Sequence, residues 1–298
     1  MRVSDVLDYL RAEKIPFTFV GDETTEVNRF SSLGNYKPGT FTWVKKQENL
    51  PDTMDDSTVT LAIVTEGVKC SFPNIVYSAE SKRAFFGAIE HFYEVVRQRP
   101  AVGQFTYISP DVKLGKNVTI GHNCTLDGDI TIGDNTKIGN NVVIVNRVDI
   151  GRNCMINSGS VIGHDGFSYL EAEDHSKTMV IHLGKVEIQD NVWIGSNCSI
   201  DRAEIDSTVI EEGCKIDPLV HVAHNVVLEK NCVVISGTNL MGSVHAGSNA
   251  YISSSIVRNQ CKLGKNCTVG MGAVVTKNVA ENTTVVGNPA RIYSRGEK

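Results

Sequence analysis

An aliphatic residue recurs at every sixth position of the chain from Ile108 to Ile162, ten times without a slip. The period resumes at Ile188 and continues to Val275, with a local irregularity between Ile200 and Ile210 and a slip near Arg258. A six-residue period matches neither the α-helix nor the heptad, and it is typical of a parallel β-helix built from hexapeptide repeats. Each hexad then supplies one short strand and a turn, and three hexads complete one triangular coil.

Small residues occupy fixed places in this repeat. Glycine follows the aliphatic residue in six of the first ten hexads, where it relieves a tight corner. Seven of the eight cysteines share one repeated position, and none belongs to a CxxC pair. We expect these cysteines to be small buried fillers of the repeat rather than disulfide partners or metal ligands. They are Cys124, Cys154, Cys198, Cys214, Cys232, Cys261 and Cys267.

The first third of the chain has no short repeat. Residues 4–13 and 81–97 predict amphipathic helices, and residues 60–65 predict a buried strand. These elements indicate a small N-terminal α/β domain over residues 1–100, with Pro100 at its end. We expect this domain to bind the nucleotide part of a substrate.

The second predicted domain, residues 101–298, is the β-helix. Its period is lost at length only over residues 168–187. A stack of coils accommodates an insertion as an excursion at a corner, and such loops often cover a binding cleft. The pattern equally allows a plain surface loop.

Charge and hydropathy exclude several classes of protein. The net charge of −5 and the pI near 5.9 argue against a general nucleic-acid binder. The first residues lack the apolar run of a signal peptide. No stretch approaches the roughly 18 uncharged apolar residues of a membrane span. We therefore expect a cytoplasmic protein without nucleic-acid partners or membrane insertion.

The histidines suggest two kinds of site. Only His221 and His224 are close in sequence, which is too few convergent ligands for a metal site, and we expect none. The other use is general-base catalysis of acyl transfer to an amine, for which a near-neutral pKa is suited. A backbone N–H on the next coil would then stabilise the oxyanion. His122 and His164 are expected to be ordinary surface residues.

Four segments carry a family resemblance. Their order and spacing are similar to those of the UDP-3-O-acylglucosamine N-acyltransferases of the lipid A pathway, which also place a small α/β domain before the helix. The resemblance implies a left-handed β-helix and a homotrimer with active sites between subunits. The segments are GHDGFSY at 163–169, IDR at 200–202, VAHNVV at 222–227 and VISGTNLMG at 234–242.

The resemblance also implies roles for single residues. His224 corresponds to the catalytic base, and Gly242 to the donor of the oxyanion N–H. Gly242 follows His224 by eighteen residues, or three hexads, so it should stack one coil above. The further substrate-binding candidates in this domain are Asp165, Phe167, Asp201, His221 and Asn225.

The N-terminal domain departs from the family pattern. The family clamps uracil with aromatic residues and an asparagine, and the comparable stretch here runs from Phe41 to Asn49. Trp43 keeps an aromatic ring for stacking on a pyrimidine base, and Phe41 is a second candidate. Lys46 and Asn49 stand where the family has Asn and Tyr, which favours a nucleotide other than UDP.

The C-terminal end departs as well. The helical extension that meets acyl carrier protein in the lipid A enzymes is not seen, and residues 255–262 lack a histidine that the family carries there. The end, VVGNPAR, instead resembles hexapeptide transferases that use coenzyme A, although a simple capping turn remains an alternative. Basic side chains here would pair with phosphates of the cofactor. The cofactor-binding candidates are Gly272, Ala273, Lys277, Asn288, Pro289 and Arg291.

These departures favour one reading of function. We expect an N-acyltransferase that uses acyl-CoA to acylate a nucleotide-linked amino-deoxysugar, such as a dTDP-linked 4-amino-4,6-dideoxyhexose, for cell-surface polysaccharide. It would be a relative of the anthrose N-acyltransferases. The alternative is the lipid A enzyme itself, with acyl carrier protein as donor. An O-acetyltransferase and a non-catalytic scaffold are rival classes.

Overall fold

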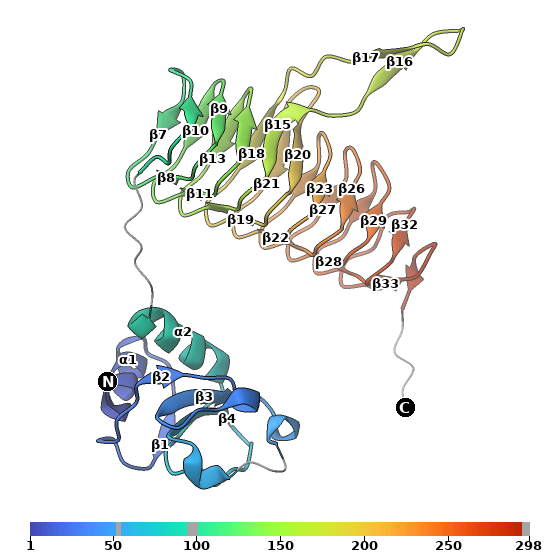
Figure 1. The fold of residues 1–298 in the computed structure, drawn as a ribbon. Helices are drawn as coiled ribbons and strands as arrows, with labels where there is room; N and C mark the ends of the chain where they lie inside the picture. The colour runs from blue at the N-terminus through green and yellow to red at the C-terminus, as the bar shows by residue number, and fades with distance from the viewer. Residues whose placement is uncertain (52–54, 94–100, 294–298) are drawn as a thin grey trace. The chain divides into compact units, whose positions relative to one another are not determined.

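The computed structural model describes residues 1–51, 55–93 and 101–293. The chain forms two compact units, Met1–Arg97 and Gln98–Lys298, which are described one at a time (Figure 1). Pro100 and the end of the second expected helix lie outside the described residues.

The first unit is an α/β domain. Its five-stranded sheet has the order β1-β5-β4-β3-β2, and only β1 runs antiparallel to its neighbour. Helix α1 begins at Val3, one residue before the expected start, with Arg2 as its N-cap. The elements are α1 Val3–Ala12, β1 Thr18–Val20, β2 Arg29–Phe30, β3 Thr40–Val44, β4 Leu61–Thr65, β5 Ile75–Ser78 and α2 Ser81–Tyr93, with 3₁₀ turns at Leu33–Asn35, Gln47–Asn49 and Asp56–Thr58.

The second unit is a parallel β-helix of three sheets, whose strands stack coil upon coil (Figure 1). The eight-stranded sheet contains β7 Lys113–Leu114, β10 Ile130–Ile132, β13 Val148–Ile150, β18 Lys185–Ile188, β21 Ser207–Ile210, β24 Val227–Leu228, β27 His245–Ala246 and β30 Lys262–Leu263. The nine-stranded sheet contains β6 Tyr107–Ile108, β9 Thr125–Asp127, β12 Val143–Val145, β15 Val161–Asp165, β20 Ser199–Arg202, β23 His221–Val222, β26 Asn239–Leu240, β29 Ile256–Val257 and β32 Val274–Val275.

The third sheet of the helix has ten strands. Its last two strands, β33 and β34, pair antiparallel, whereas the others are parallel. The strands are β8 Thr119–Ile120, β11 Lys137–Ile138, β14 Met155–Ile156, β19 Trp193–Ile194, β22 Lys215–Ile216, β25 Val233–Val234, β28 Tyr251–Ile252, β31 Thr268–Val269, β33 Thr284–Val286 and β34 Arg291–Ile292.

The periodic aliphatic residues form the core of the helix. Ile144, Ile162 and Ile200 are fully buried, whereas Leu114, in the first coil, is 41% exposed because few coils cover that end. All seven cysteines of the repeat are buried free thiols, which confirms their expected role as fillers. The predicted fold class, a small α/β domain followed by a left-handed hexapeptide β-helix, is confirmed.

Asparagine and glycine share the corners of the coils. Many corner residues are asparagines in the left-handed backbone conformation, such as Asn117 with φ of 56°, which asparagine tolerates better than most residues. The glycine that follows an aliphatic residue is needed for space and not for its backbone conformation. At Gly121 an added Cβ would lie 2.4 Å from the Gly139 carbonyl oxygen of the next coil. This glycine is required by the close approach of stacked backbones.

The excursion projects from the helix as a two-stranded hairpin, formed by β16 Tyr169–Glu171 and β17 Lys177–Met179 (Figure 1). The coils continue to stack across it, because β13 pairs with β18 and β15 with β20, the latter with a register shift between Ile162 and His164. The returning chain passes along the nine-stranded sheet before β18 begins. It thereby brings residues 179–182 toward the face of that sheet.

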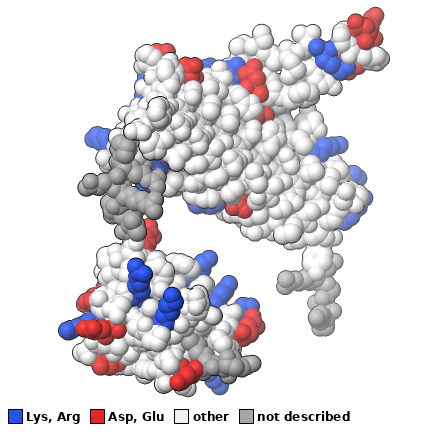
Figure 2. All heavy atoms as spheres, in the orientation of Figure 1, with Lys and Arg blue, Asp and Glu red and all other residues white. Residues whose placement is uncertain are grey.

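The surface has few charges on one side. Figure 2 shows that charged side chains are sparse on the face of the β-helix that is turned to the viewer. Among the described residues, no helix is both long and apolar enough to span a membrane.

Candidate active site

A cavity of about 640 Å³ opens on the nine-stranded sheet of the β-helix. Its floor comes from four consecutive strands, β15, β20, β23 and β26, and from the corners that follow them. The returning chain of the excursion forms one wall. The lining residues are His164, Asp165, Gly166, Phe167, Met179, Val180, Asp201, His221, Ala223, His224, Met241 and Gly242.

His224 and Gly242 are stacked at equivalent positions of adjacent coils. The strands before them pair in register, and the Ser243 N–H donates to the His224 carbonyl at 2.9 Å. A Cβ on Gly242 would lie 2.6 Å from His224 Nε2, so only glycine leaves room for the ring. Among the described residues, the Gly242 N–H has no protein acceptor. That N–H is therefore available to a ligand beside the imidazole.

Asn225 fixes the tautomer of His224. Its side-chain NH₂ donates to the Ile205 carbonyl at 2.8 Å, and its Oδ1 accepts from the Glu204 N–H at 3.1 Å. This orientation turns Oδ1 toward His224 Nδ1, 3.1 Å away, so Nδ1 must donate. The neutral ring then carries its lone pair on Nε2, next to Gly242. Asn225 does not line the cavity, in contrast to its expected role in binding substrate.

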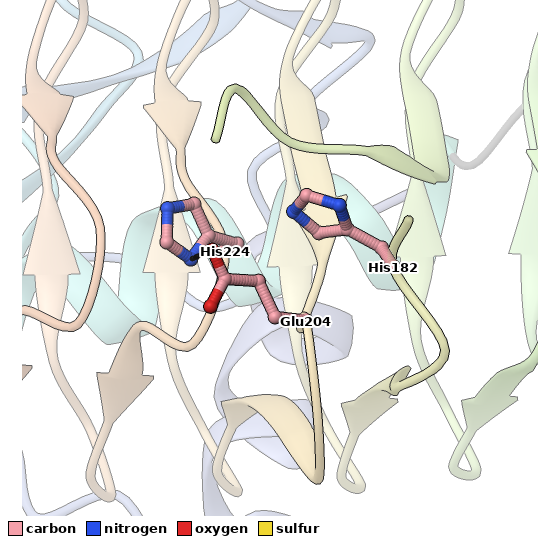
Figure 3. Close-up of side chains that lie close together, drawn as sticks. All are labelled: His182, Glu204 and His224. Carbon is pink, nitrogen blue, oxygen red and sulfur yellow. Dashed lines mark ion pairs between the residues drawn. The ribbon is translucent and has the colours of Figure 1, made fainter. Parts of the chain in front are cut away.

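Two residues beside His224 had no sequence signal. His182, on the returning chain of the excursion, is fully buried, and its ring centroid lies 5.6 Å from that of His224. Glu204 places a carboxylate oxygen 4.0 Å from His224 Nδ1. Both residues lie in stretches where the six-residue period fails. Only a structure brings them together with His224 (Figure 3).

A buried carboxylate lies under the histidines of the cavity. Asp201 is 3% exposed, with His164 Nε2 3.1 Å from its Oδ1 and His221 Nε2 3.9 Å from its Oδ2. Burial raises the pKa of the Asp201 carboxyl above its usual range, and four surrounding histidines oppose that rise: His164, His221, His224 and His182. Asp201 therefore faces histidines rather than open solvent.

His164 is part of the site and not an isolated surface residue. Its Nδ1 lies 2.9 Å from the Asp165 carbonyl, which can only accept, and its Nε2 lies 3.0 Å from Ser199 Oγ. The Asp165 side chain pairs with Arg202 at 2.7 Å. Phe167 is 76% exposed at the cavity mouth. Six predicted residues thus line one cavity: Asp165, Phe167, Asp201, His221, His224 and Gly242.

The first unit has a cavity of its own, of about 630 Å³. Trp43 lines it beside Phe86, and Trp43 Nε1 donates to Ser81 Oγ at 3.0 Å. The first turn of α2 lies at this cavity, together with Lys45, Lys46, Lys82 and Arg83. An apolar wall with cations and a helix N-terminus is suited to a base and its phosphates.

Phe41 does not belong to this cavity, and its expected role in binding substrate is wrong. The side chain is fully buried and packs edge-on against Phe85, with ring centroids 5.3 Å apart. Phe41 and Trp43 lie on the same side of β3, but Phe41 is covered by α2. It is a core residue of the α/β unit.

The C-terminal candidates divide into two groups. Lys277 and Arg291 line a cavity of about 260 Å³ together with other residues of the last coils. Ala273 is buried in the helix core, so its side chain cannot contact a cofactor. The other candidates, Gly272, Asn288 and Pro289, do not line that cavity.

Models of repeat families match the second unit. The bacterial transferase hexapeptide model, of six repeats, matches residues 129–164. The model of the hexapeptide repeat of succinyl-transferase matches residues 111–146 and 185–217. A model of the GMPPB C-terminal domain matches residues 203–295. Each model covers less than half of the chain.

Two curated relatives share a name. The UDP-3-O-acylglucosamine N-acyltransferase of Wolinella succinogenes is 37% identical over 140 residues, which are 47% of this chain and 44% of that protein. The protein of the same name from Helicobacter pylori strain J99 is 46% identical over 97 residues, or 33% of this chain and 29% of that protein. The matches therefore span less than half the length of these relatives.

Solved structures share the fold. The UDP-N-acetylglucosamine O-acyltransferase of Moraxella catarrhalis superposes with a TM-score of 0.60 and 23% identity, over 65% of this chain and 74% of that chain. Together with the repeats and the relatives, this shows a hexapeptide-repeat β-helix protein that resembles the UDP-3-O-acylglucosamine N-acyltransferases.

Proposed function

We propose that the protein transfers an acyl group from a thioester to the amino group of a nucleotide-linked sugar. The names of the relatives favour a UDP-linked acceptor, as in the lipid A reaction, over the dTDP-linked amino-deoxysugar that the sequence first suggested. The resemblance favours acyl carrier protein as the bearer of the thioester.

One observation carries this proposal. The imidazole of His224 and the backbone of Gly242, whose N–H has no acceptor among the described residues, line the same cavity from adjacent coils. Acyl transfer to an amine needs a group that takes a proton and a donor that stabilises an oxyanion. The tautomer that Asn225 selects places the basic nitrogen of His224 at Gly242.

The reaction follows from this arrangement. The acceptor amine attacks the thioester carbonyl carbon, forming a C–N bond and an oxyanion. The Gly242 N–H donates to that oxyanion, and His224 Nε2 takes a proton from the amine nitrogen. When the tetrahedral intermediate collapses, the C–S bond breaks and the thiolate leaves. The imidazolium of His224 then returns the proton to sulfur, which leaves an amide and a free thiol.

The nucleotide would bind in the first unit. In this proposal the Trp43 ring stacks on the pyrimidine base, and the lysines with the first turn of α2 bind the diphosphate. This deepens the role expected for residues 1–100 and rests on the cavity at Trp43 and Phe86.

Acyl-CoA remains a second candidate for the donor, because one observation favours it. Lys277 and Arg291 approach a common cavity in the last coils, where two cations suit the phosphates of a nucleotide cofactor. Acyl-CoA and acyl carrier protein share the same phosphopantetheine thioester, so the chemistry at His224 is unchanged.

The oligomer that we propose is a homotrimer, as the resemblance implies. Large apolar side chains around the cavity and the excursion support an interface there, because each is at least 69% exposed in the single chain. Sedimentation should give three times the 32.5 kDa chain mass, and a monomer at assay concentrations would contradict this. The side chains are Phe167, Leu170, Ile181, Leu183 and Ile205.

The test of the proposed function is transfer of a labelled acyl group, assayed with UDP-linked and dTDP-linked amino sugars and with both donors. With the preferred pair, His224→Ala should lower kcat by about 10²–10⁴-fold if the imidazole is the base. His245→Ala is the matched control, because His245 pairs with Glu229 on another sheet. A loss below about fivefold would remove the base from the mechanism, and no transfer to any amine would overturn the proposal.

A further inference from the structure

His182 is a buried imidazole with one nitrogen unused. The residue is fully buried, and its Nδ1 lies 3.0 Å from the Val180 carbonyl, which can only accept. Nδ1 therefore carries the hydrogen, and Nε2 carries a lone pair. In the described part of the chain, Nε2 has no hydrogen-bond partner. A buried acceptor without a donor is costly, so this nitrogen points to a ligand.

Two further ligand groups converge on that nitrogen. One atom each from His182, Glu204 and His224 lie within 4.8 Å of one another. Figure 3 shows the His182 ring pointing toward His224, with the Glu204 carboxylate below the His224 ring. The Glu204 oxygen is 4.0 Å from His224 Nδ1. Gly166 keeps the space between the two rings open, since a Cβ there would lie 3.2 Å from His182 Nε2.

We propose that His182, Glu204 and His224 form a binding site for a divalent zinc ion. Two imidazoles and one carboxylate, with a fourth position left to water, are a donor set that Zn²⁺ uses in proteins. His182 also has the support typical of a zinc ligand, because its second nitrogen donates to a backbone carbonyl. The three ligand atoms need to close by less than 2 Å to reach the spacing of a tetrahedral site.

The prediction of no metal site was based only on histidines that are close to each other in sequence. The excursion supplies His182 forty-two residues before His224, and the irregular corner before β21 supplies Glu204. Neither follows the hexapeptide period. The zinc site is thus a product of two places where the coil departs from its repeat.

Zinc and the proposed base would exclude each other, and this consequence rests on the proposed function. A metal on His224 Nδ1 takes the lone pair of that nitrogen and breaks its bond to Asn225. The ring proton must then reside on Nε2, which can no longer accept a proton from the amine. Bound zinc would hold the enzyme in an inactive state.

The test is calorimetric titration of the full-length protein with ZnCl₂ in the absence of substrates. We expect one zinc per chain, and binding at least about tenfold weaker in His182→Gln and Glu204→Gln. Glu204 is partly exposed, so its variant should fold even if the buried His182 variant does not. His245→Gln is the control, because it removes a histidine–glutamate pair that has no third ligand in the described part of the chain.

The outcomes are separable from those of the acyl-transfer assay. No binding by the wild type, or equal affinity in the wild type and Glu204→Gln, would overturn the zinc site and leave the proposed function untouched. Zinc binding by a protein that shows no acyl transfer would support the zinc site and overturn the proposed function. Where both hold, zinc should inhibit the wild type reversibly, with recovery on addition of a chelator, and should inhibit Glu204→Gln only at higher concentration.

Discussion

At the scale of single residues, the candidate site depends on the absence of a side chain at Gly242. The imidazole of His224 fills the space where any other residue would carry a Cβ. The glycine thus has two uses: its N–H is free and its α-carbon admits the ring. Asn225 completes the arrangement by choosing which nitrogen of His224 is basic.

Replacing Gly242 with alanine should therefore impair catalysis more than folding. The added methyl would lie 2.6 Å from Nε2 and push the ring away from the substrate. We expect kcat to fall by about 100-fold, as displacements of this size do, with little change in Tm. Steady-state kinetics and thermal unfolding measure the two effects. Gly34→Ala, where a Cβ meets nothing within 4 Å, should change neither; an active Gly242→Ala would contradict the geometry.

Asp201 should make stability depend on pH. Burial raises the pKa of its carboxyl, and such a group stabilises the fold while protonated and loses that contribution as pH rises through the raised value. Asp201→Asn should therefore gain stability relative to wild type as pH rises from about 5 through the raised pKa of Asp201, measured by urea unfolding.

The control for this comparison is Asp190→Asn. Arg152 holds the pKa of Asp190 below its usual range, so its contribution is already complete at pH 5 and the difference from wild type should stay constant. A relative loss of stability by Asp201→Asn over the same interval would contradict the assignment.

Sequence spacing predicted part of this site and missed the rest for a physical reason. His224 and Gly242 are eighteen residues apart, and a regular stack places such residues together. His182 and Glu204 lie where the period fails, so no count along the chain places them. Phe41 was misassigned because composition does not show which aromatic residue of a strand a helix covers.

At the scale of the element, the coils are joined at their corners by side chains as well as by strands. Asn266 has φ of 56°, accepts from Asn249 at 3.0 Å and donates to Asn282 at 2.9 Å. This ladder of asparagine side chains keeps the corners, with their left-handed backbone conformation, aligned from coil to coil. The period predicted these strands well, because each inward residue must be aliphatic; it did not predict the ladder, since corner side chains bond to residues a whole coil away.

Asn266→Ala should destabilise the β-helix by about 2 kcal/mol, from the left-handed backbone and the two lost side-chain bonds. Asn266→Gly should cost less than half of that, because glycine adopts the same φ without strain. Urea unfolding of both variants checks the order. Equal losses would mean that the ladder, and not the backbone conformation, dominates at this corner.

At the scale of the whole molecule, the two units have separate tasks in the proposed reaction. The first offers a cavity for a nucleotide, and the second offers the reacting groups. Binding and chemistry should therefore respond to different substitutions.

Trp43→Ala tests this division. Loss of a stacking ring worth about 1–3 kcal/mol should raise KM for the nucleotide sugar by about 5–150-fold, while kcat stays within about twofold. Trp193→Phe, at the other tryptophan of the chain, is the control. An equal fall in kcat for Trp43→Ala would argue that the first unit also takes part in the chemical step.

The position of the cavity within the stack protects the active site from local unfolding. Each coil of a solenoid is coupled to its two neighbours and to little else. The four strands under the cavity have β6, β9 and β12 on one side and β29 and β32 on the other. Local unfolding begins at the ends of such a stack. The outer coils can therefore unfold and refold while the reacting groups of the central coils stay in register.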